Sequence, residues 1–430
     1  MHRLTVWTTN CIQAQSTHRV PRSAANVSDS TFKNGPLADL RVIELGTLLA
    51  GPFCGQLLGD FGAEVIKVEP PGQGDPMRVW GRQKEQEPSL WWPVVARNKK
   101  AVTLDLRHKA GQALLKELVA KADFLLENFR PGTLEKWGLG WPELAAVNPR
   151  LIMIRVSGFG QTGPRARDPG FGAIGEAMGG LRYVVGDPAT PPSRMGISIG
   201  DSLAATFAAV GALSALHYRE RTGRGQVVDS AIYEAVLNMM ESVVTEFDQR
   251  GFVRERTGAI LPNVAPSNIY PTSDGIVLIA ANQDTVFRRL CLAMGTPELA
   301  DDPRYHSHQA RGARQRELDA RVGEWTQTLT TQGVLEILRR EATAVPSGLI
   351  YRAPDMLEDP HFKAREAIVS VPHPAFGELR MQNVAPKLSV TPGSIRAPAP
   401  EIGQHNEEVF RGLLGLSEAR FRDLKASNII

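Results

Sequence analysis

The segment RVIELGTLLAGPFCGQLLGDFGAEVIKVE, residues 41–69, decides the fold class. Its two apolar runs, Arg41–Leu45 and Ala63–Glu69, have the length and composition of buried β-strands. A glycine-containing turn and the helix-like stretch 53–62 lie between them. A strand, a helix and a second strand in this order predict a βαβ unit with two parallel strands.

The same alternation continues along the chain. An amphipathic stretch at residues 109–122 is flanked by further apolar runs, at 101–106, 123–128 and 151–160. Repeated βαβ units predict a parallel sheet covered by helices. We therefore expect a large Rossmann-like α/β domain over residues 38–235, completed by residues 390–430. Ligands of such sheets bind at the carboxyl ends of the strands.

The second half of the chain has a different character. Helices are predicted from Asp201 to Arg221 and over residues 229–251, the end of the second falling in a linker at 236–267. IYPTSDGIVLIAA (269–281) predicts a hairpin with a Ser-Asp-Gly turn. With the charged helices that follow, it predicts a smaller α+β domain over 268–345. Residues 346–389 are expected to form a return linker.

Composition narrows the function. The 49 basic and 46 acidic residues nearly cancel in a chain of 430 residues, which does not favour a nucleic-acid groove. Three cysteines, Cys11, Cys54 and Cys291, have neither metal-ligand spacing nor the density of a disulfide framework, so a reducing compartment is expected. No window has the length of an uncharged membrane span. We expect a cytoplasmic protein that binds neither membrane nor nucleic acid.

The first 37 residues are rich in Ser, Thr and Arg and contain no acidic residue before Asp29. An apolar region typical of a signal peptide is missing. We expect a disordered or targeting-like extension, and a location in the mitochondrial matrix if it is a targeting sequence.

Three kinds of site are disfavoured. Gly46, Gly51 and Gly55 do not have the G-x-G-x-x-G spacing of a nicotinamide site. His306 and His308 have no partner Cys or Asp cluster that would make a metal site. The G-x-S-x-G elbow of a hydrolase is absent from the sequence. We expect no metal and no permanently bound cofactor.

Basic residues recur after the predicted strand ends. Singly they suit solvated surface charges, but together on one rim of a parallel sheet they would suit a ligand with several phosphates. Asn128 and Phe129 would offer such a ligand an amide and a flat aromatic face. The basic residues are Lys67, Arg78, Arg97, Lys99, Lys100, Arg130 and Lys136.

Asp201, in GISIGDSLAA, precedes the predicted helix and allows two compatible interpretations. Aspartate is a favoured N-cap that accepts backbone N–H groups at a helix start. The same donors would keep the carboxylate ionised close to a strand end, where ligands bind.

Segments spread over nearly the whole chain closely resemble the class III coenzyme A transferases, the group of formyl-CoA transferase, carnitine CoA-transferase and the bile-acid-inducible protein F type. The resemblance covers about residues 36–415. It is carried, in order, by the segment 37–78, ARNKKAVTLDL, ENFRPGTLEKWGLG, NPRLIMIRVSGFGQTGP, GISIGDSLAA, ERTGRGQVVDSAIYEAVL and GQHNEEVFRGLLG.

The resemblance implies roles for particular residues. Asp201 matches the family's nucleophilic aspartate. The CoA-binding residues fall on Lys99 or Lys100, on Asn128 and Phe129, and on Lys136 where relatives have arginine. The basic residues above would then hold the CoA phosphates.

Other positions depart from family members. Gly172 stands where formyl-CoA transferases have a glutamate, and Thr47 and Leu49 replace a histidine and a glutamine, which disfavours oxalate and formate chemistry. Phe171 stands where 2-methylacyl-CoA racemases have an acid/base histidine.

The resulting hypothesis is a CoA-transferase. Asp201 attacks the thioester of an acyl-CoA such as succinyl-CoA, and the reaction proceeds through an aspartyl acyl anhydride and an aspartyl-CoA thioester. Arg194 is predicted to bind the far carboxylate of a small dicarboxylate acceptor, although a surface role is an equal alternative. A racemase or epimerase of acyl-CoA and a non-catalytic CoA-binding protein remain as alternatives. The resemblance also implies a homodimer of two interlinked, ring-shaped subunits.

Overall fold

The computed structural model describes residues 35–82 and 84–430. The predicted N-terminal extension therefore lies outside the described residues except for its last three. Of these, Leu37 donates a backbone hydrogen bond of 2.9 Å to the Phe61 carbonyl at the end of the first helix.

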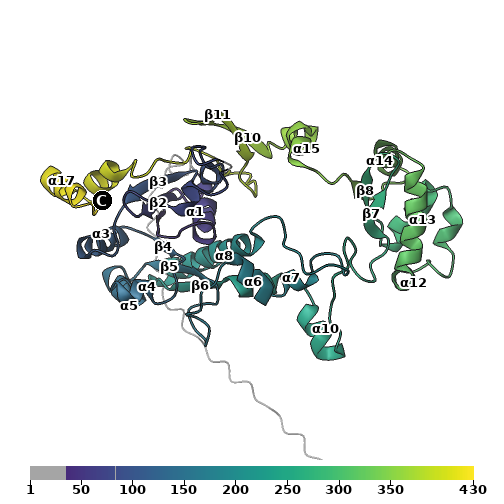
Figure 1. Cartoon of the computed structure of the whole chain (residues 1–430), viewed down its shortest axis with the longest axis horizontal. Helices are drawn as coiled ribbons and strands as arrows, with labels where there is room; N and C mark the ends of the chain where they lie inside the picture. The colour runs from purple at the N-terminus through teal and green to yellow at the C-terminus, as the bar shows by residue number, and fades with distance from the viewer. Residues whose placement is uncertain (1–34, 83) are drawn as a thin grey trace, which may run out of the picture.

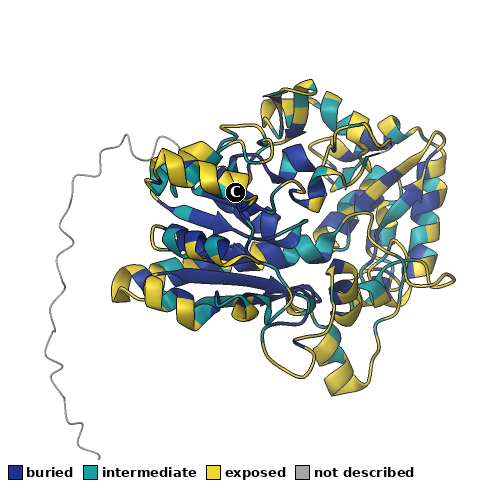
Figure 2. Ribbon diagram, turned by 60° about the vertical axis from the view of Figure 1, so that its left-hand side comes forward, coloured by how far each residue is buried: buried dark blue, intermediate teal, exposed yellow. Residues whose placement is uncertain are grey.

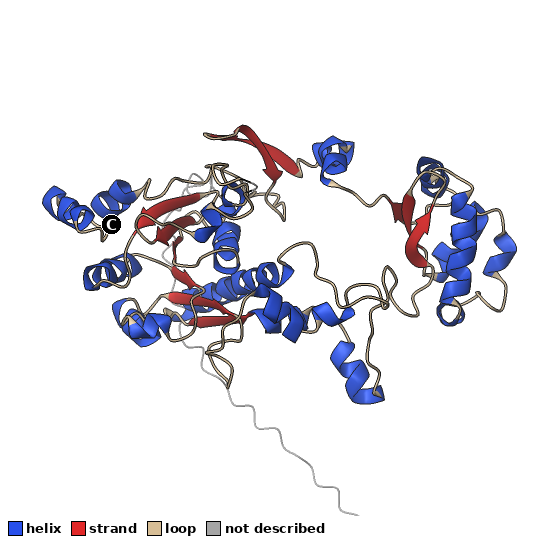
Figure 3. Cartoon of the chain, in the orientation of Figure 1, coloured by secondary structure: helices blue, strands red, loops and turns tan. Residues whose placement is uncertain are grey.

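Six parallel strands form the main sheet in the order β3-β2-β1-β4-β5-β6. Figure 3 shows the strands in red and the surrounding helices in blue. This is the strand order of doubly wound, Rossmann-type sheets, whose winding direction reverses between β1 and β4. The predicted Rossmann-like sheet is confirmed. Its strands are β1 (Arg41–Glu44), β2 (Glu64–Glu69), β3 (Lys99–Thr103), β4 (Phe124–Glu127), β5 (Ile152–Ser157) and β6 (Val227–Ala231).

Helices cover both faces of this sheet, so its strands are buried on both sides (Figure 2). Neighbouring residues of one strand enter opposite cores, as Val42 and Ile43 do in β1. One core packs the sheet against α3, α5 and the C-terminal residues, and the other against α1, α8 and α9. The large unit contains α1 (Ala50–Asp60), η2 (Pro76–Arg78), α2 (Trp92–Val95), α3 (Lys109–Val119), α4 (Thr133–Lys136), α5 (Trp141–Val147), α6 (Gly172–Met178), α7 (Leu181–Val184), α8 (Ile199–Thr222) and α9 (Ile232–Asn238). Helix α10 (Val243–Arg250) follows in the connection toward the smaller unit (Figure 1).

Helix α8 corrects one expectation. Among the described helices it is long and apolar enough to cross a membrane by length and composition, although the sequence was expected to hold no such window. Its buried side is rich in alanine, including Ala204, Ala208 and Ala212. These small side chains let α8 pack closely on α1 and the sheet.

The helix predicted over residues 229–251 is also wrong. Residues 227–231 form β6, and two separate helices, α9 and α10, follow. Gly225 allows the new strand to start, because a side chain there would lie 1.7 Å from the Leu151 carbonyl before β5. Glu241, with a φ of 50°, breaks the helical path between α9 and α10.

A smaller α+β unit lies beyond α10, and two chain connections join it to the large unit (Figure 1). The predicted hairpin forms its sheet, to which the short β9 adds a third strand. A separate core contains Tyr270, Val277 and Leu335. The elements are β7 (Ser267–Pro271), β8 (Ile276–Ala280), α11 (Asp284–Ala293), η3 (Pro297–Ala300), α12 (His308–Ala313), α13 (Gln315–Gln327), α14 (Thr331–Arg339) and β9 (Ser347–Gly348).

The segment expected as a return linker carries regular structure. An antiparallel hairpin with a six-residue register pairs β10 with β11. After an extended proline-rich stretch, the chain ends on the large unit, where Phe410 and Ile429 join its core. The elements are α15 (Ala353–Glu358), α16 (Pro360–Ala364), β10 (Ile368–His373), β11 (Gly377–Gln382), the π-helix η4 (Glu407–Leu413) and α17 (Glu418–Ala426).

Candidate active site

Asp201 is the third residue of α8, because the helix begins two residues earlier with Ser198 as its N-cap. The expectation that Asp201 is the N-cap is therefore wrong. The chain passes from the end of β5 through α6 and α7 into α8, and α8 leads to the start of β6. The first turn of α8 thus lies at the carboxyl-end edge of the sheet, where ligands of this fold bind.

The Asp201 carboxylate lies against the backbone of Gly172, the first residue of α6. A Cβ at position 172 would stand 2.3 Å from Oδ2 of Asp201. Helices α6 and α8 also meet at Gly200, where an added Cβ would lie 2.9 Å from Cγ of Glu176 and 3.1 Å from the Gly172 carbonyl oxygen. Glycine at both positions allows this close backbone approach.

The carboxylate is half-buried and accepts no hydrogen bond from any of the described residues. Burial raises the pKa of the Asp201 carboxyl to about 6, repulsion from Glu176 adds to the rise, and Arg194 partly offsets it. The sequence-based expectation that helix N–H donors hold this group ionised is wrong. An unpaired carboxylate that is costly to ionise is typical of a reactive group.

Two further predicted residues lie next to this turn. Arg194 is exposed, donates a hydrogen bond of 3.3 Å to Oγ of Ser198, and is close enough to Asp201 to lower its pKa. Phe171, which precedes Gly172, is 70% exposed. The region around Asp201 therefore combines an open aromatic side chain, a cation and a carboxylate.

The switch point of the sheet is occupied by the turn after β1 and the turn after β4. Oδ1 of Asn128 accepts from the Thr47 amide at 2.7 Å, and Nδ2 donates to the Thr47 carbonyl at 2.9 Å. Asn128 therefore clamps the two turns together. Leu48, the next residue, has a φ of 63°, a strained conformation for leucine, and its N–H donates to Asp75 at 3.1 Å.

A cavity of about 170 Å³ opens beside these turns. Phe129 and Trp137 form one side with rings 5.6 Å apart, and the exposed Arg107 lies at another. Lys136 is exposed on α4 next to Trp137. The aromatic pair and nearby cations have the chemistry of a nucleotide site.

The cations expected on a single rim occupy different places. Lys99 and Lys100 begin β3, so they lie at the amino-end edge of the sheet, and Arg97 precedes them. The prediction of one common rim is therefore wrong. Arg78 does lie beyond the carboxyl end of β2, but it pairs with Glu69 at 2.7 Å and stacks on the ring of Trp92 at 3.8 Å.

Three of these cations are buried and paired. Lys67 is 1% exposed, with Nζ 2.7 Å from Asp75 and 3.4 Å from Glu44. Nζ of Lys99 is 2.8 Å from Glu44.

Arg97 pairs with Asp60 at 2.6 Å, and the half-buried Lys100 bridges Glu64 and Glu408. These side chains form structural ion pairs, and Lys67, Arg97 and Lys99 do not face solvent.

Loop 158–171 connects the switch point to Asp201. Nε of Arg130 donates to the Arg167 carbonyl at 2.6 Å, four residues before Phe171. Gly158 and Gly170 approach so closely that a Cβ on Gly158 would lie 3.0 Å from the Gly170 Cα. The loop thus starts at the end of β5, passes the turn after β4 and places Gly172 against Asp201.

Sequence reasoning missed Glu176 and Arg182. Glu176 is 1% exposed, and its Oε2 lies 3.2 Å from the Arg182 guanidinium. The only sequence signal was a glutamate among small residues in FGAIGEAMGG.

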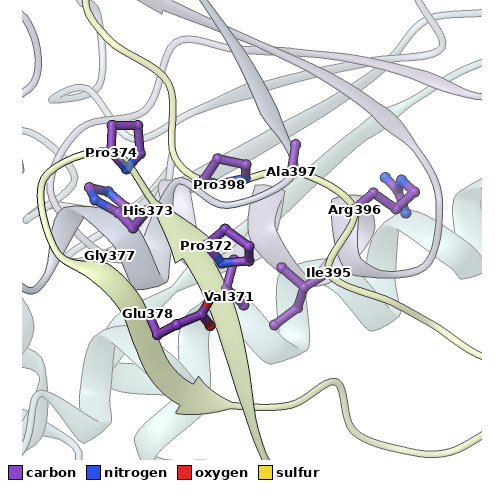
Figure 4. A pocket seen from close by; sticks show the side chains of 10 residues that line it. All are labelled: Val371, Pro372, His373, Pro374, Gly377, Glu378, Ile395, Arg396, Ala397 and Pro398. Carbon is purple, nitrogen blue, oxygen red and sulfur yellow. The ribbon is translucent and has the colours of Figure 1, made fainter.

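A cavity of about 670 Å³ lies between the β10–β11 hairpin and residues 395–398 (Figure 4). None of the predicted site residues lines it.

A doubly wound sheet with a carboxylate that is unpaired among the described residues at its carboxyl-end edge, and an aromatic, cationic cavity at its switch point, fits an enzyme that acts on a nucleotide-bearing substrate. The chain belongs to CoA-transferase family III, whose model matches residues 37–406. It is therefore a CoA-transferase, and acyl-CoA thioesters and carboxylic acids are its classes of substrate.

Named relatives agree with this assignment. The chain is 62% identical to the succinyl-CoA–D-citramalate CoA-transferase of Chloroflexus aurantiacus, covering 92% of this chain and 98% of that protein. It is 43% identical to the beta subunit of the succinyl-CoA–L-malate CoA-transferase of the same organism, covering 94% and 100%. The crystal structure of a CaiB/BaiF family protein from Brucella suis superposes with a TM-score of 0.77 at 34% identity, covering 89% and 100%.

Proposed function

We propose that this protein moves CoA from succinyl-CoA to a small dicarboxylate, with Asp201 as the covalent nucleophile. The relatives named for D-citramalate and L-malate both use succinyl-CoA by name and both take a hydroxylated dicarboxylate. The observation that carries the proposal is the Asp201 carboxylate, half-buried, unpaired among the described residues and pressed against the Gly172 backbone.

The chemistry needs four balanced exchanges at one carboxylate. Asp201 attacks the carbonyl of the donor thioester and the C–S bond breaks. CoA thiolate departs, and a succinyl–aspartyl anhydride is formed. The thiolate then attacks the aspartyl carbonyl. Succinate leaves, and an aspartyl-CoA thioester is formed. The acceptor carboxylate attacks this thioester, forms a second anhydride between the acceptor and Asp201, and again frees CoA thiolate. The thiolate then takes the acceptor acyl group and restores Asp201.

The geometry around Asp201 suits these four reaction steps. A carboxylate without hydrogen bonds keeps its lone pairs available, and partial burial lowers the local dielectric and strengthens each electrostatic contact. Gly172 leaves the face of the carboxylate free of side-chain atoms, so that the thioester carbonyl can approach. Backbone N–H groups of the glycine-rich loop 158–171 are the donors we assign to the developing oxyanion.

We place the CoA nucleotide at the switch point. Phe129 and Trp137 offer faces for the adenine, while Arg107 and Lys136 are exposed cations for the phosphates. Asn128 holds the pocket in shape through Thr47. The pantetheine arm would then follow loop 158–171 from this cavity to Asp201.

Arg194 is our candidate for binding the far carboxylate of the acceptor. Its guanidinium is exposed, is anchored to Ser198 and is close enough to influence Asp201. Arg194→Ala is expected to raise the Michaelis constant for a dicarboxylate about tenfold, as loss of one charged hydrogen bond does, and to leave that for a monocarboxylate unchanged. An unchanged constant for the dicarboxylate would remove this role.

We also propose an interlinked homodimer in the reducing interior of the cell. Two chain connections separate the large and small units (Figure 1), and the outer side of α8 exposes Val210 and Leu213. Phe247 of α10 is 59% exposed in the same chain. Apolar side chains in such numbers are typical of a subunit interface. Sedimentation as a monomer would contradict the dimer.

The decisive experiment pairs a panel of acyl-CoA donors with carboxylic acids and identifies the products by mass spectrometry. Succinyl-CoA with a hydroxylated C4 or C5 dicarboxylate is expected to react fastest, and hydroxylamine should trap the acyl group on Asp201. Deuterium entering the α-carbon from solvent, without exchange of CoA, would indicate a racemase instead. Binding of acyl-CoA without any exchange would indicate a non-catalytic protein.

A further inference from the structure

Glu176 is a buried carboxylate next to the proposed nucleophile, and the reaction as written does not use it. It lies on α6, one turn after Gly172, and only 1% of its surface is exposed. Its Oε1 accepts the backbone N–H of Gly200 at 3.3 Å. Because Gly200 immediately precedes Asp201, this hydrogen bond ties α6 to the first turn of α8.

The second oxygen of Glu176 binds a cation. Nε and a terminal nitrogen of Arg182, on α7, both lie 3.2 Å from Oε2. The Arg182 side chain is 26% exposed, so the ion pair is shielded on the side of Glu176 and open on the side of Arg182. Three helices, α6, α7 and α8, are therefore joined through one carboxylate.

Packing alone would not require a charge here. The α6–α8 contact is made by glycines, since an added Cβ on Gly200 would lie 2.9 Å from Cγ of Glu176 and one on Gly172 would overlap Asp201. An apolar side chain would fill the same space without a buried charge. A carboxylate at this point opposes ionisation of Asp201. A buried like charge beside a reactive group is costly and calls for a functional explanation.

We infer that Glu176, held by Arg182, is a positioning residue that seats the first turn of α8 against α6, and that its charge keeps the Asp201 carboxylate high in free energy and hence nucleophilic. The charges acting on Asp201 are Glu176 from α6 and Arg194 from the segment before α8, while Arg182 acts through Glu176. This inference rests on the proposed role of Asp201.

The test measures kcat, KM and the pH profile of kcat/KM for succinyl-CoA transfer in the full chain. Glu176→Gln removes the charge. The acid limb of the profile is expected to move down by about one pH unit, the effect of one nearby charge, because Asp201 ionises more easily without the negative charge of Glu176. The Arg182 cation left behind lowers the pKa of Asp201 further. The kcat is expected to fall about tenfold with little change in KM, since Asp201 becomes less nucleophilic while the contacts that bind the substrate stay in place.

Glu176→Asp is the companion variant. It keeps the charge but draws the carboxylate away from Gly200, so kcat should fall while the acid limb stays with wild type. The matched control is Glu220→Gln. Glu220 is an ion-paired glutamate on α8, 19 residues from Asp201 along that helix and so about 28 Å away. The control should change neither quantity.

Three results decide the outcome. A wild-type acid limb in Glu176→Gln, or a wild-type kcat in Glu176→Asp, overturns the inference. If Glu176→Gln does not fold, Glu176→Asp alone decides it. Asp201→Asn in the same assay separates the two hypotheses: turnover by that variant removes the nucleophile assignment, whereas its inactivity beside unchanged Glu176 variants removes only this inference.

Discussion

Two groups of carboxylates in this chain have opposite surroundings. Glu44 and Asp75 are buried, and each meets the ammonium of Lys67; Glu44 also meets that of Lys99. Asp201 is only half-buried, yet it accepts no hydrogen bond from the described residues. The pKa values follow these surroundings. Burial would raise the pKa of Asp75, but attraction to Lys67 lowers it overall, whereas that of Asp201 rises to about 6.

The difference teaches that burial of a charge does not by itself mark a reactive group. The paired carboxylates order the turns around β1, because Asp75 accepts the N–H groups of Leu48 and Met77. The unpaired carboxylate orders nothing, and its free lone pairs are available to a substrate. Pairing therefore separates the structural carboxylates from Asp201, the proposed catalytic one.

The largest expected effect is the loss of transfer in Asp201→Asn. An amide cannot form the anhydride, so kcat should fall about 10⁴-fold or more, as when a covalent nucleophile is removed. In the wild type, kcat/KM should decline below pH 6, because Asp201, with a pKa of about 6, is then protonated and no longer nucleophilic. Substantial turnover by the variant, measured by CoA exchange, would break the comparison on its catalytic side.

The next largest effect is expected in the paired group. Lys67→Met keeps the side-chain stem but leaves Glu44 and Asp75 facing an uncharged group. Removing one partner of a buried ion pair costs about 3–5 kcal/mol of unfolding free energy. Denaturant unfolding measures this loss. The control is Lys84→Met, whose side chain is 78% exposed and whose pairing with Glu87 at 3.7 Å is open to solvent. An equal change in both variants would show that the buried network is not structural.

A third prediction concerns the stability cost of the unpaired carboxylate. The pKa of Asp201 is higher in the folded state, so the folded chain binds this proton more tightly than the unfolded chain does. Stability is therefore lost as pH rises from about 4 to about 6. Above that range the free energy of unfolding of Asp201→Asn should be higher than that of the wild type by up to about 3 kcal/mol, at about 1.4 kcal/mol per pKa unit. Near pH 4 the two proteins should be equally stable, and a constant difference across the range would contradict this account.

Much of the fold was predictable because buried parallel strands appear as short apolar runs, as in Ile152–Ser157. Strand β6 was not, because its polar residues Asp229 and Ser230 extend an apparently helical pattern. The β10–β11 hairpin was missed for a similar reason, since its exposed strands lack a continuous apolar run.

The site was predictable to a different degree. Asp201 was identified through the family motif, whereas its missing hydrogen bonds depend on how α6 meets α8. Lys99 and Lys100 were grouped with the strand-end cations although the predicted strand at 101–106 follows them; they begin β3, at the amino-end edge of the sheet. Glu176 acquires its meaning only through Gly200, 24 residues away.

The smallest effect is expected from Gly172→Ala, which sharpens the comparison by moving the unpaired carboxylate without removing it. The new methyl group would lie 2.3 Å from Oδ2 of Asp201, so the carboxylate must shift. A displacement of about 1 Å from the reacting position costs about 10²-fold in kcat. The control is Gly412→Ala, in η4, where the added carbon would meet no described atom within 4 Å apart from its own residue, its chain neighbours and the nearby backbone of its helix. Thermal unfolding and kcat measured on both variants separate displacement from unfolding. Full activity in Gly172→Ala would mean that the contact between α6 and Asp201 is irrelevant to catalysis.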